Sequence, residues 1–116
     1  MNTLRGGGSL QPGQQLRSNN GGYTLVMQHD GNLVLYEPGG KAAWDTGTWG
    51  GPPETLPIRA EMQHDGNFVL YDAVNEPRWD SGTWDQPGAR IVLQDDRNLV
   101  IYDRNNRALW DSGTWL

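Results

Sequence analysis

The side chains in this sequence that are best suited to chemistry form a nine-residue pattern that occurs three times. Alternating positions of the pattern carry Gln, Asp, Asn, Val and Tyr. The copies are Gln28, Asp30, Asn32, Val34 and Tyr36; Gln63, Asp65, Asn67, Val69 and Tyr71; and Gln94, Asp96, Asn98, Val100 and Tyr102. A carboxylate accepts hydrogen bonds, an amide donates and accepts them, and a phenol does either. The set suits a neutral ligand with several adjacent hydroxyl groups and some C–H surface, such as a pyranose.

One copy of this pattern would need no special explanation, because the outer face of a strand is often simply solvated. Solvation does not require the same amide, carboxylate, amide and phenol at equivalent places in three copies. We therefore interpret the pattern as a repeated binding site. None of its five positions carries Arg or Lys, so a phosphate group would be a poor match.

A second motif begins eight residues after the last tyrosine of each copy. Its sequence is Trp-Asp-Thr/Ser-Gly-Thr-Trp, and it starts at Trp44, Trp79 and Trp110. Both motifs advance by 35 residues from the first copy to the second and by 31 residues from the second to the third. Internal repetition of this kind predicts a single domain built from stacked units. The expected domain is 1–116, with repeats at about 16–50, 51–85 and 86–116, and with residues 1–15 completing a sheet.

Short β-strands are the elements that must position these side chains. Residues 23–28 and 33–36 are rich in β-branched, aromatic and aliphatic residues, and turn residues flank them. A three-residue loop over 29–31 pairs Gln28 with Asn32 and places a glycine where such loops need a left-handed conformation. The motif side chains then share one face. The third copy has Arg97 at this glycine position, which predicts mild backbone strain.

The same register places apolar residues on the opposite face of every repeat. The expected core residues are Leu25, Met27, Leu33 and Leu35; Ile58, Ala60, Met62, Phe68 and Leu70; and Ala89, Ile91, Leu93, Leu99 and Ile101. A single hairpin cannot bury one apolar face alone. We therefore expect three sheets that face a common axis, filled by Trp44, Trp79 and Trp110. The third repeat has no strand-forming segment before Ala89, so the N-terminal residues are expected to close its sheet.

Composition limits the classes of partner. The net charge is -5 at pH 7, which disfavours nucleic acid and anionic membranes. There is no apolar leader-like start, no run of membrane-spanning length and no Cys. Six Trp in regular clusters argue against disorder, despite 16 Gly and 7 Pro. We expect a soluble protein, secreted or cytoplasmic, with no nucleic-acid partner and no membrane insertion.

The repeated pattern resembles the Q-x-D-x-N-x-V-x-Y signature of the monocot mannose-binding lectins, the bulb-lectin family, which also occur in bacteria, fungi and fish. Every signature position is intact in all three copies, and the repeats cover nearly the whole chain. The resemblance implies an all-β fold called β-prism II, with three antiparallel four-stranded sheets in a pseudo-threefold arrangement around an axial Trp core. The lack of Cys, where many plant members carry a disulfide, suits a bacterial-type member.

The resemblance also implies a role for each signature residue in binding mannose without calcium or any other cofactor. In the first repeat, Asp30 and Asn32 would hold the axial 2-hydroxyl, Gln28 the 3-hydroxyl and Tyr36 the 4-hydroxyl, with Val34 beneath the ring. The same roles would recur at the equivalent positions of the other repeats. The expected partners are mannose-containing glycans and glycoproteins, bound multivalently.

Several alternatives remain beside this interpretation. Catalysis is not expected, because each site has one Asp whereas a glycosidase uses two carboxylates. A calcium site usually gathers several carboxylates as well. A protein-interaction or bacteriocin-type module with idle sugar sites stays open. The role of the second Trp of each repeat also stays open, at Trp49, Trp84 and Trp115. These residues could pack at the prism edge, form a contact in a homodimer, or provide a stacking surface for longer glycans. The apolar end, Trp115-Leu116, is a hypothetical element of strand exchange in such a dimer.

Overall fold

The computed structural model describes the whole chain, residues 1–116, as an all-β protein. Its strands, in chain order, are β1 (Thr3–Leu4), β2 (Ser9–Leu10), β3 (Gln15–Arg17), β4 (Thr24–Met27), β5 (Leu33–Tyr36), β6 (Ala42–Asp45), β7 (Arg59–Met62), β8 (Phe68–Tyr71), β9 (Pro77–Asp80), β10 (Arg90–Leu93), β11 (Leu99–Tyr102) and β12 (Ala108–Asp111). A 3-10 turn, η1 (Pro53–Thr55), is the only helix. None of the helical structure is long and apolar enough to cross a membrane.

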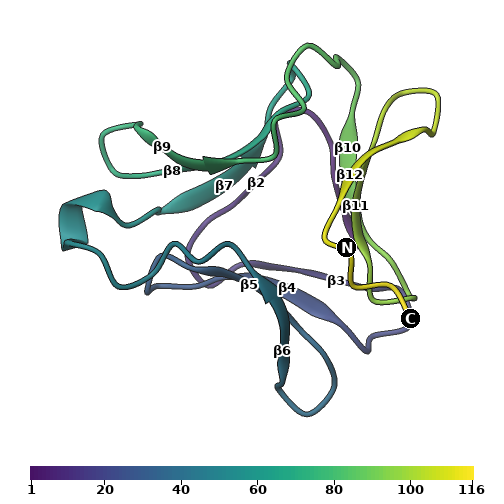
Figure 1. Cartoon of the computed structure of the whole chain (residues 1–116), viewed down its shortest axis with the longest axis horizontal. Helices are drawn as coiled ribbons and strands as arrows, with labels where there is room; N and C mark the ends of the chain where they lie inside the picture. The colour runs from purple at the N-terminus through teal and green to yellow at the C-terminus, as the bar shows by residue number, and fades with distance from the viewer.

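The strands form three four-stranded sheets, ordered β3-β4-β5-β6, β2-β7-β8-β9 and β1-β10-β11-β12. Every pairing within them is antiparallel. Figure 1 shows the sheets as three sides of a triangle around a central axis. Each sheet takes three strands from one repeat and one strand from the N-terminal segment. The expected fold class, three antiparallel sheets in a pseudo-threefold arrangement, is confirmed.

The N-terminal segment closes the sheet of the third repeat, as the sequence predicted, and it also contributes a strand to each of the other two sheets, which the sequence did not predict. Strand β1 pairs with β10 of the third repeat, β2 with β7 of the second and β3 with β4 of the first. Each of these short strands carries one buried leucine: Leu4, Leu10 and Leu16. Their spacing of six residues is the sequence signal for this arrangement. The segment thereby covers an edge of each hairpin that would otherwise expose unpaired backbone groups.

The predicted hairpin register is present in each repeat. Met27 lies opposite Leu33, and the Gln28 backbone N–H donates to the Asn32 carbonyl over 2.9 Å. The loop residue at the glycine position has a φ of 89° at Gly31, and Arg97 adopts the same left-handed region with a φ of 75°. The loop geometry predicted from Gly31 is therefore kept in the third repeat, at the strained position that was expected.

All the predicted core residues are buried except Ile58, which is 40% exposed. The prediction for this residue was wrong because β7 begins only at Arg59. Ile58 lies just before the strand, where its backbone N–H bonds to the Tyr71 carbonyl. The preceding Pro57 is buried in its place.

The three Trp that open the second motif meet at the axis, as the sequence predicted. Their ring centroids are 5.6–5.9 Å apart and every pair is edge-to-face, with interplanar angles of 70–79°. Each Trp is partly buried and packs against the leucine-rich core. Edge-to-face aromatic pairs add about 0.5–1.5 kcal/mol each beyond their buried area. One such triad joins the three repeats, so Trp44, Trp79 and Trp110 stabilise the assembly of the sheets.

The third repeat departs from the pattern at the positions where it meets the first. Arg97 donates to the Glu37 carboxylate over 2.6 Å and to the Thr114 carbonyl over 2.8 Å. Asp95, which replaces the histidine of the other copies, accepts the Asn20 backbone N–H over 2.8 Å. The contacts with Glu37 and Asn20 connect the last repeat to the first and close the ring.

Replacing the axial Trp44 by Ala should lower the free energy of unfolding by about 3–5 kcal/mol, because it removes a large aromatic side chain from the triad. The matched control is Trp49→Ala in the same repeat, where the side chain is 63% exposed and a change within about 0.5 kcal/mol is expected. Urea unfolding followed by circular dichroism measures both. Equal losses for the two variants would contradict the central role of the triad.

Candidate functional site

The five signature residues of each repeat lie together on the outer face of its sheet, on the side away from the axis. In the first repeat, Gln28 follows β4, Asp30 lies in the loop, Asn32 precedes β5, and Val34 and Tyr36 lie in β5. The second repeat places its set at the same points around β7 and β8, and the third around β10 and β11. The structure thus brings together all fifteen predicted side chains as three separate groups of five.

The asparagine of the signature is the most firmly held residue of the site. Its side chain is only 5% exposed at Asn32. The Asn32 Nδ2 donates to Asp45 Oδ2 over 3.0 Å, while its Oδ1 accepts the Thr46 hydroxyl and the Thr48 backbone N–H, each over 3.2 Å. These bonds fix the orientation of the amide and leave one Nδ2 hydrogen to bind a ligand.

The neighbouring aspartate is held through one carboxylate oxygen only. Asp30 Oδ1 accepts the Asn32 backbone N–H over 2.9 Å, and the same bond recurs at Asp65 and Asp96. This is an Asx turn, which shapes the loop by a local side-chain bond. The second oxygen is available as an acceptor in an exposed loop. An acceptor and an amide donor therefore stand next to each other in every site.

The remaining signature residues frame this pair. Gln28 Nε2 donates to the Tyr36 hydroxyl, and the equivalent bond is present in the other two repeats. The tyrosine hydroxyl can still donate to a ligand. Val34 is only 3% exposed, so it offers a ligand a small apolar area and otherwise supports its neighbours.

A second carboxylate joins each site, and the prediction of one carboxylate per site was therefore wrong. Asp45 on β6 lies directly opposite Val34 on β5, which puts both side chains on the same face. Asp80 and Asp111 occupy the same position in the other repeats. These aspartates follow the axial Trp in the second motif, so the sequence carried the signal. Recognising it required the pairing of the two strands, which includes an irregularity after Leu35.

The three sites differ at their margins. Arg59 lies over the Tyr71 ring at 4.6 Å in the second repeat, and Arg90 lies over Tyr102 at 5.2 Å in the third. The residue opposite Tyr36 in the first repeat is Thr24. A cation above a tyrosine ring holds it in place through the ring quadrupole. The tyrosines of the second and third sites are therefore more firmly held than that of the first.

The polar faces are open surfaces and not cavities. The two hollows in the molecule, of about 210 and 230 Å³, lie at the junctions between successive repeats. They contain none of the fifteen signature residues. No three His, Asp or Glu side chains gather closely enough to hold a metal ion. The geometry supports binding by surface hydrogen bonds to a ligand that stays largely in contact with water.

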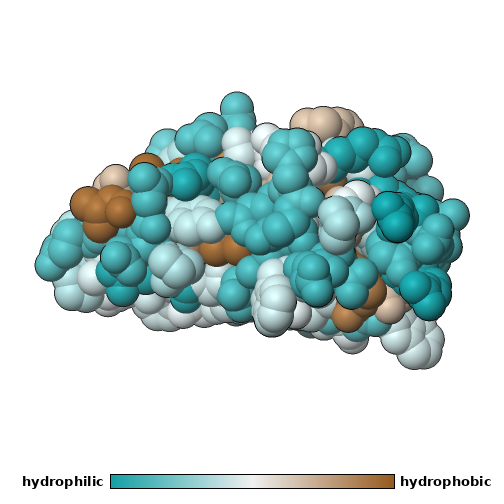
Figure 2. Space-filling model, turned by 90° about the horizontal axis from the view of Figure 1, so that it is seen from above, coloured by the Kyte–Doolittle hydropathy of each residue, from teal (hydrophilic) through white to brown (hydrophobic).

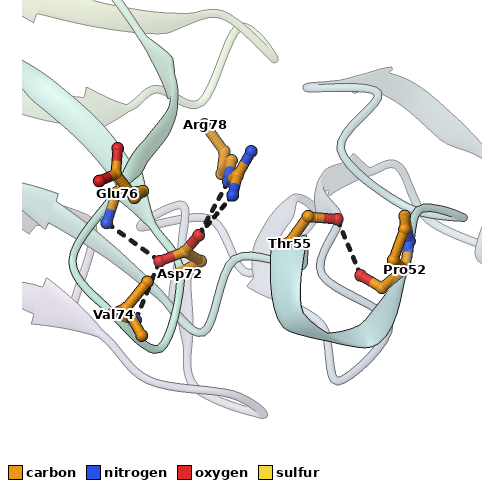
Figure 3. Close-up of polar contacts among 6 residues, drawn as sticks. All are labelled: Pro52, Thr55, Asp72, Val74, Glu76 and Arg78. Carbon is orange, nitrogen blue, oxygen red and sulfur yellow. Dashed lines mark hydrogen bonds and ion pairs between the residues drawn. The ribbon is translucent and has the colours of Figure 1, made fainter.

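In the second and third repeats the aspartate that follows the signature tyrosine holds the turn beyond it. Asp72 is fully buried, and Figure 3 shows its carboxylate receiving the backbone N–H groups of Val74 and Glu76 and the Arg78 guanidinium. Burial raises the pKa of Asp72, but the bonds from Glu76, Arg78 and Val74 outweigh burial and hold the pKa below its usual value.

The third repeat has the same arrangement at Asp103. Its carboxylate accepts the backbone N–H groups of Asn105 and Arg107 over 2.8 and 2.9 Å, and the Arg107 guanidinium over 3.0 Å. The hydrogen bond from the Arg107 backbone lowers the pKa of Asp103 more than burial raises it. Both turns are therefore held by ionised carboxylates next to a signature tyrosine.

Comparison with known proteins places the chain among sugar-binding proteins. No family model matches it. A solved structure of a monomeric monocot mannose-binding lectin from Gastrodia elata is 40% identical, with a TM-score of 0.87 and full coverage of both chains. The mannose-specific agglutinin of snowdrop (Galanthus nivalis), complexed with methyl α-D-mannoside, is 39% identical, with a TM-score of 0.76 and coverage of 100% of this chain and 99% of that one.

A shorter match reaches the mannose-specific lectin of Narcissus pseudonarcissus. It is 49% identical over 49 residues, which span 42% of this chain and 42% of the relative. The fold is that of a β-prism II lectin. Sequence identity over the full length then makes the assignment specific: the chain belongs to the monocot mannose-binding lectin family.

The ionised turn carboxylates predict a loss of stability in acid. An unfolded Asp has a pKa of about 3.9, whereas the pKa values of Asp72 and Asp103 lie lower in the folded chain. At a pH between the folded and the unfolded pKa, the unfolded state binds more protons than the folded state. The stabilisation from these two carboxylates is therefore fully present above the unfolded pKa, and it is lost as the pH falls through the folded pKa. Urea unfolding at pH 3, 4, 5 and 7 measures this. The double variant D72N/D103N should be less stable at pH 7 and should lose less stability between pH 5 and pH 3; an unchanged pH dependence would contradict the assignment.

The loop glycine of the second site should resist substitution for a steric reason. A Cβ at Gly66 would lie 2.3 Å from the Gln86 carbonyl oxygen, whereas a Cβ at Gly82, which also has a positive φ, would have no atom within 4 Å. Gly82→Ala should therefore lower stability by about 1–2 kcal/mol through backbone strain alone. Gly66→Ala should lower stability by about 1–3 kcal/mol more than Gly82→Ala, because its Cβ also clashes with the Gln86 carbonyl. Thermal unfolding compares them, and equal losses would show that the linker between the repeats moves freely.

Proposed function

We propose that this chain binds mannose and mannose-rich glycans at three sites, multivalently and without calcium. The observation that carries the proposal is the pairing of a free aspartate oxygen with a fixed asparagine amide on each outer face. Asp30 and Asn32 form the pair in the first repeat, and Asp65–Asn67 and Asp96–Asn98 form it in the others. The methyl α-D-mannoside complex of the snowdrop agglutinin supports the same ligand class.

The proposed contacts follow from the donors and acceptors of the site. The axial 2-hydroxyl of mannose donates to Asp30 and accepts from Asn32, since a hydroxyl can do both at once. Gln28 bonds to the 3-hydroxyl, Tyr36 to the 4-hydroxyl, and Val34 lies beneath the ring. An equatorial 2-hydroxyl, as in glucose, would leave the buried Asn32 amide without its ligand partner. An unpaired polar group of this kind is a strong source of discrimination.

Three sites per chain compensate for the weakness of each one. A shallow site buries little of a sugar, and water competes for every hydroxyl. Connecting several such sites on one rigid body raises the avidity for glycans that present several mannose residues at a matching spacing. Because the outer faces point away from a common axis (Figure 1), the sites face different directions. They are suited to glycans on different branches or on different molecules.

Binding without catalysis is part of the proposal. The second carboxylate of the first site, Asp45, accepts a hydrogen bond from Asn32, and this bond supports a positioning role rather than an acid or nucleophile role. The solved neighbours with this fold are lectins. The expected result is that a chromogenic mannoside incubated with the protein is not hydrolysed.

A single chain suffices as the binding unit. Each sheet has four strands from the same chain, and the Leu116 backbone N–H donates to the Asp96 carbonyl over 2.9 Å. The end of the chain is thus held on its own third repeat, which does not favour the strand exchange that the apolar end suggested. A homodimer formed in that way stays a prediction, which the molar mass from light scattering tests.

Titration calorimetry with methyl α-mannoside in EDTA tests the proposed function. The expected result is binding of three sugars per chain, and no heat with methyl α-glucoside. Each of the variants D30N, D65N and D96N should lower the stoichiometry by one, because the new amide keeps the Asx turn but removes the free acceptor. The triple variant should keep its fold by circular dichroism and bind no mannoside. Retained binding by the triple variant, or loss of binding in EDTA, would contradict the proposal.

A further inference from the structure

We propose that Trp49, Trp84 and Trp115 each form a second subsite, on which the next sugar residue of a bound mannose glycan stacks. This inference rests on the proposed function and extends each primary site to the adjoining residue of the same glycan. The three indoles are 63%, 66% and 67% exposed. They therefore do not pack at the edge of the prism, which was one of the roles that the sequence left open.

The threonine before each of these tryptophans is bonded to the loop of the adjacent primary site, and in the second and third repeats a backbone N–H after the tryptophan is bonded to it as well. In the third repeat, Thr114 before the indole donates to the Asn98 side chain over 3.3 Å and to the Arg97 carbonyl over 2.7 Å. Leu116 after the indole donates to the Asp96 carbonyl over 2.9 Å. Trp115 is therefore held from both sides on the loop that carries Asp96 and Asn98.

The second repeat also holds the segment around its exposed indole from both sides, and the first repeat holds it from the threonine side. In the second repeat, Thr83 donates to Asn67 over 3.2 Å and to the Gly66 carbonyl over 2.6 Å, and the Gln86 backbone N–H donates to the Asp65 carbonyl over 2.8 Å. In the first repeat, Thr48 makes the two equivalent bonds to Asn32 and Gly31. One exposed Trp thus borders each primary site, fixed by the same residue that orients the signature asparagine.

The chemistry of an exposed indole fits one occupant well. Its faces are broad and apolar, and its N–H donates a hydrogen bond. The C–H face of a pyranose can cover such a ring while its hydroxyls remain in water or accept from the indole N–H. A hollow of about 230 Å³ adjoins Trp49 and includes Thr48, Leu56 and Arg78. It is smaller than the roughly 300–1,000 Å³ pockets that enclose drug-sized ligands, and so suits a single ring.

A contact between protein subunits fits the surface less well. The three indoles lie on three different repeats, one next to the loop of each primary site. The face in Figure 2 is mainly hydrophilic, with small and separate apolar areas. Three isolated aromatic residues, each beside a sugar site, match the branches of a glycan better than they match one protein partner.

The test compares the triple variant W49A/W84A/W115A with the wild type and with the conservative variant W49F/W84F/W115F. Titration calorimetry is run with methyl α-mannoside and with a branched mannotriose. The wild type should bind the trisaccharide more tightly than the monosaccharide. The Ala variant should lose about tenfold in trisaccharide affinity while its affinity for methyl α-mannoside hardly changes, and the Phe variant should recover most of the loss. Thermal unfolding checks that the variants fold equally well.

Other outcomes would overturn the inference in distinguishable ways. An Ala variant that binds both sugars like the wild type shows that the indoles touch no glycan. Equal losses for both sugars show that the indoles support the primary site only. A wild-type dimer that the Ala variant converts to a monomer, measured by light scattering, assigns the indoles to a subunit contact. A wild type that binds neither sugar refutes the proposed function itself.

Discussion

Burial of one face of each hairpin is the constraint on which the rest of this molecule depends. Side chains alternate across a strand, so a hairpin whose leucines, methionines and isoleucines must leave water has no freedom in what its other face presents. Three hairpins around the triad of Trp44, Trp79 and Trp110 bury those faces together. The outward groups of Gln, Asp, Asn and Tyr follow from this register. A shift of the strand register by one residue would turn the core side chains outward and the signature side chains inward.

The sequence predicted the parts of the fold that repeat. Three copies of one pattern supported the same hairpin register, and that register placed the signature residues and nearly all of the core correctly. It predicted that the N-terminal residues close the third sheet. It did not predict that they also supply edge strands to the other two sheets, since a two-residue strand has almost no local signal beyond one leucine such as Leu10. The exposure of Ile58 was missed for a similar reason. The strand β7 begins at Arg59, one residue after Ile58, and alternation of residue types does not report where a strand begins.

The residues that sequence reasoning missed in the site are those whose role depends on a third strand. Asp45 belongs to β6, and its place opposite Val34 depends on how β5 and β6 pair through an irregular step. The same holds for Thr48, which orients the Asn32 amide from sixteen residues away. The structure also explains residues that depart from the repeat, which the sequence alone did not. Arg97 breaks the glycine pattern, yet it pairs with Glu37 and helps to close the ring.

The central claim is that each outer face, held in place by the buried one, is a mannose site. The most direct test is a crystal structure of the chain with methyl α-mannoside at saturating concentration. We expect one sugar on each sheet, with its axial 2-hydroxyl within hydrogen-bond distance of both the signature aspartate and the signature asparagine. Absence of the sugar from all three faces, with or without sugar at the hollows between repeats, would contradict this proposal.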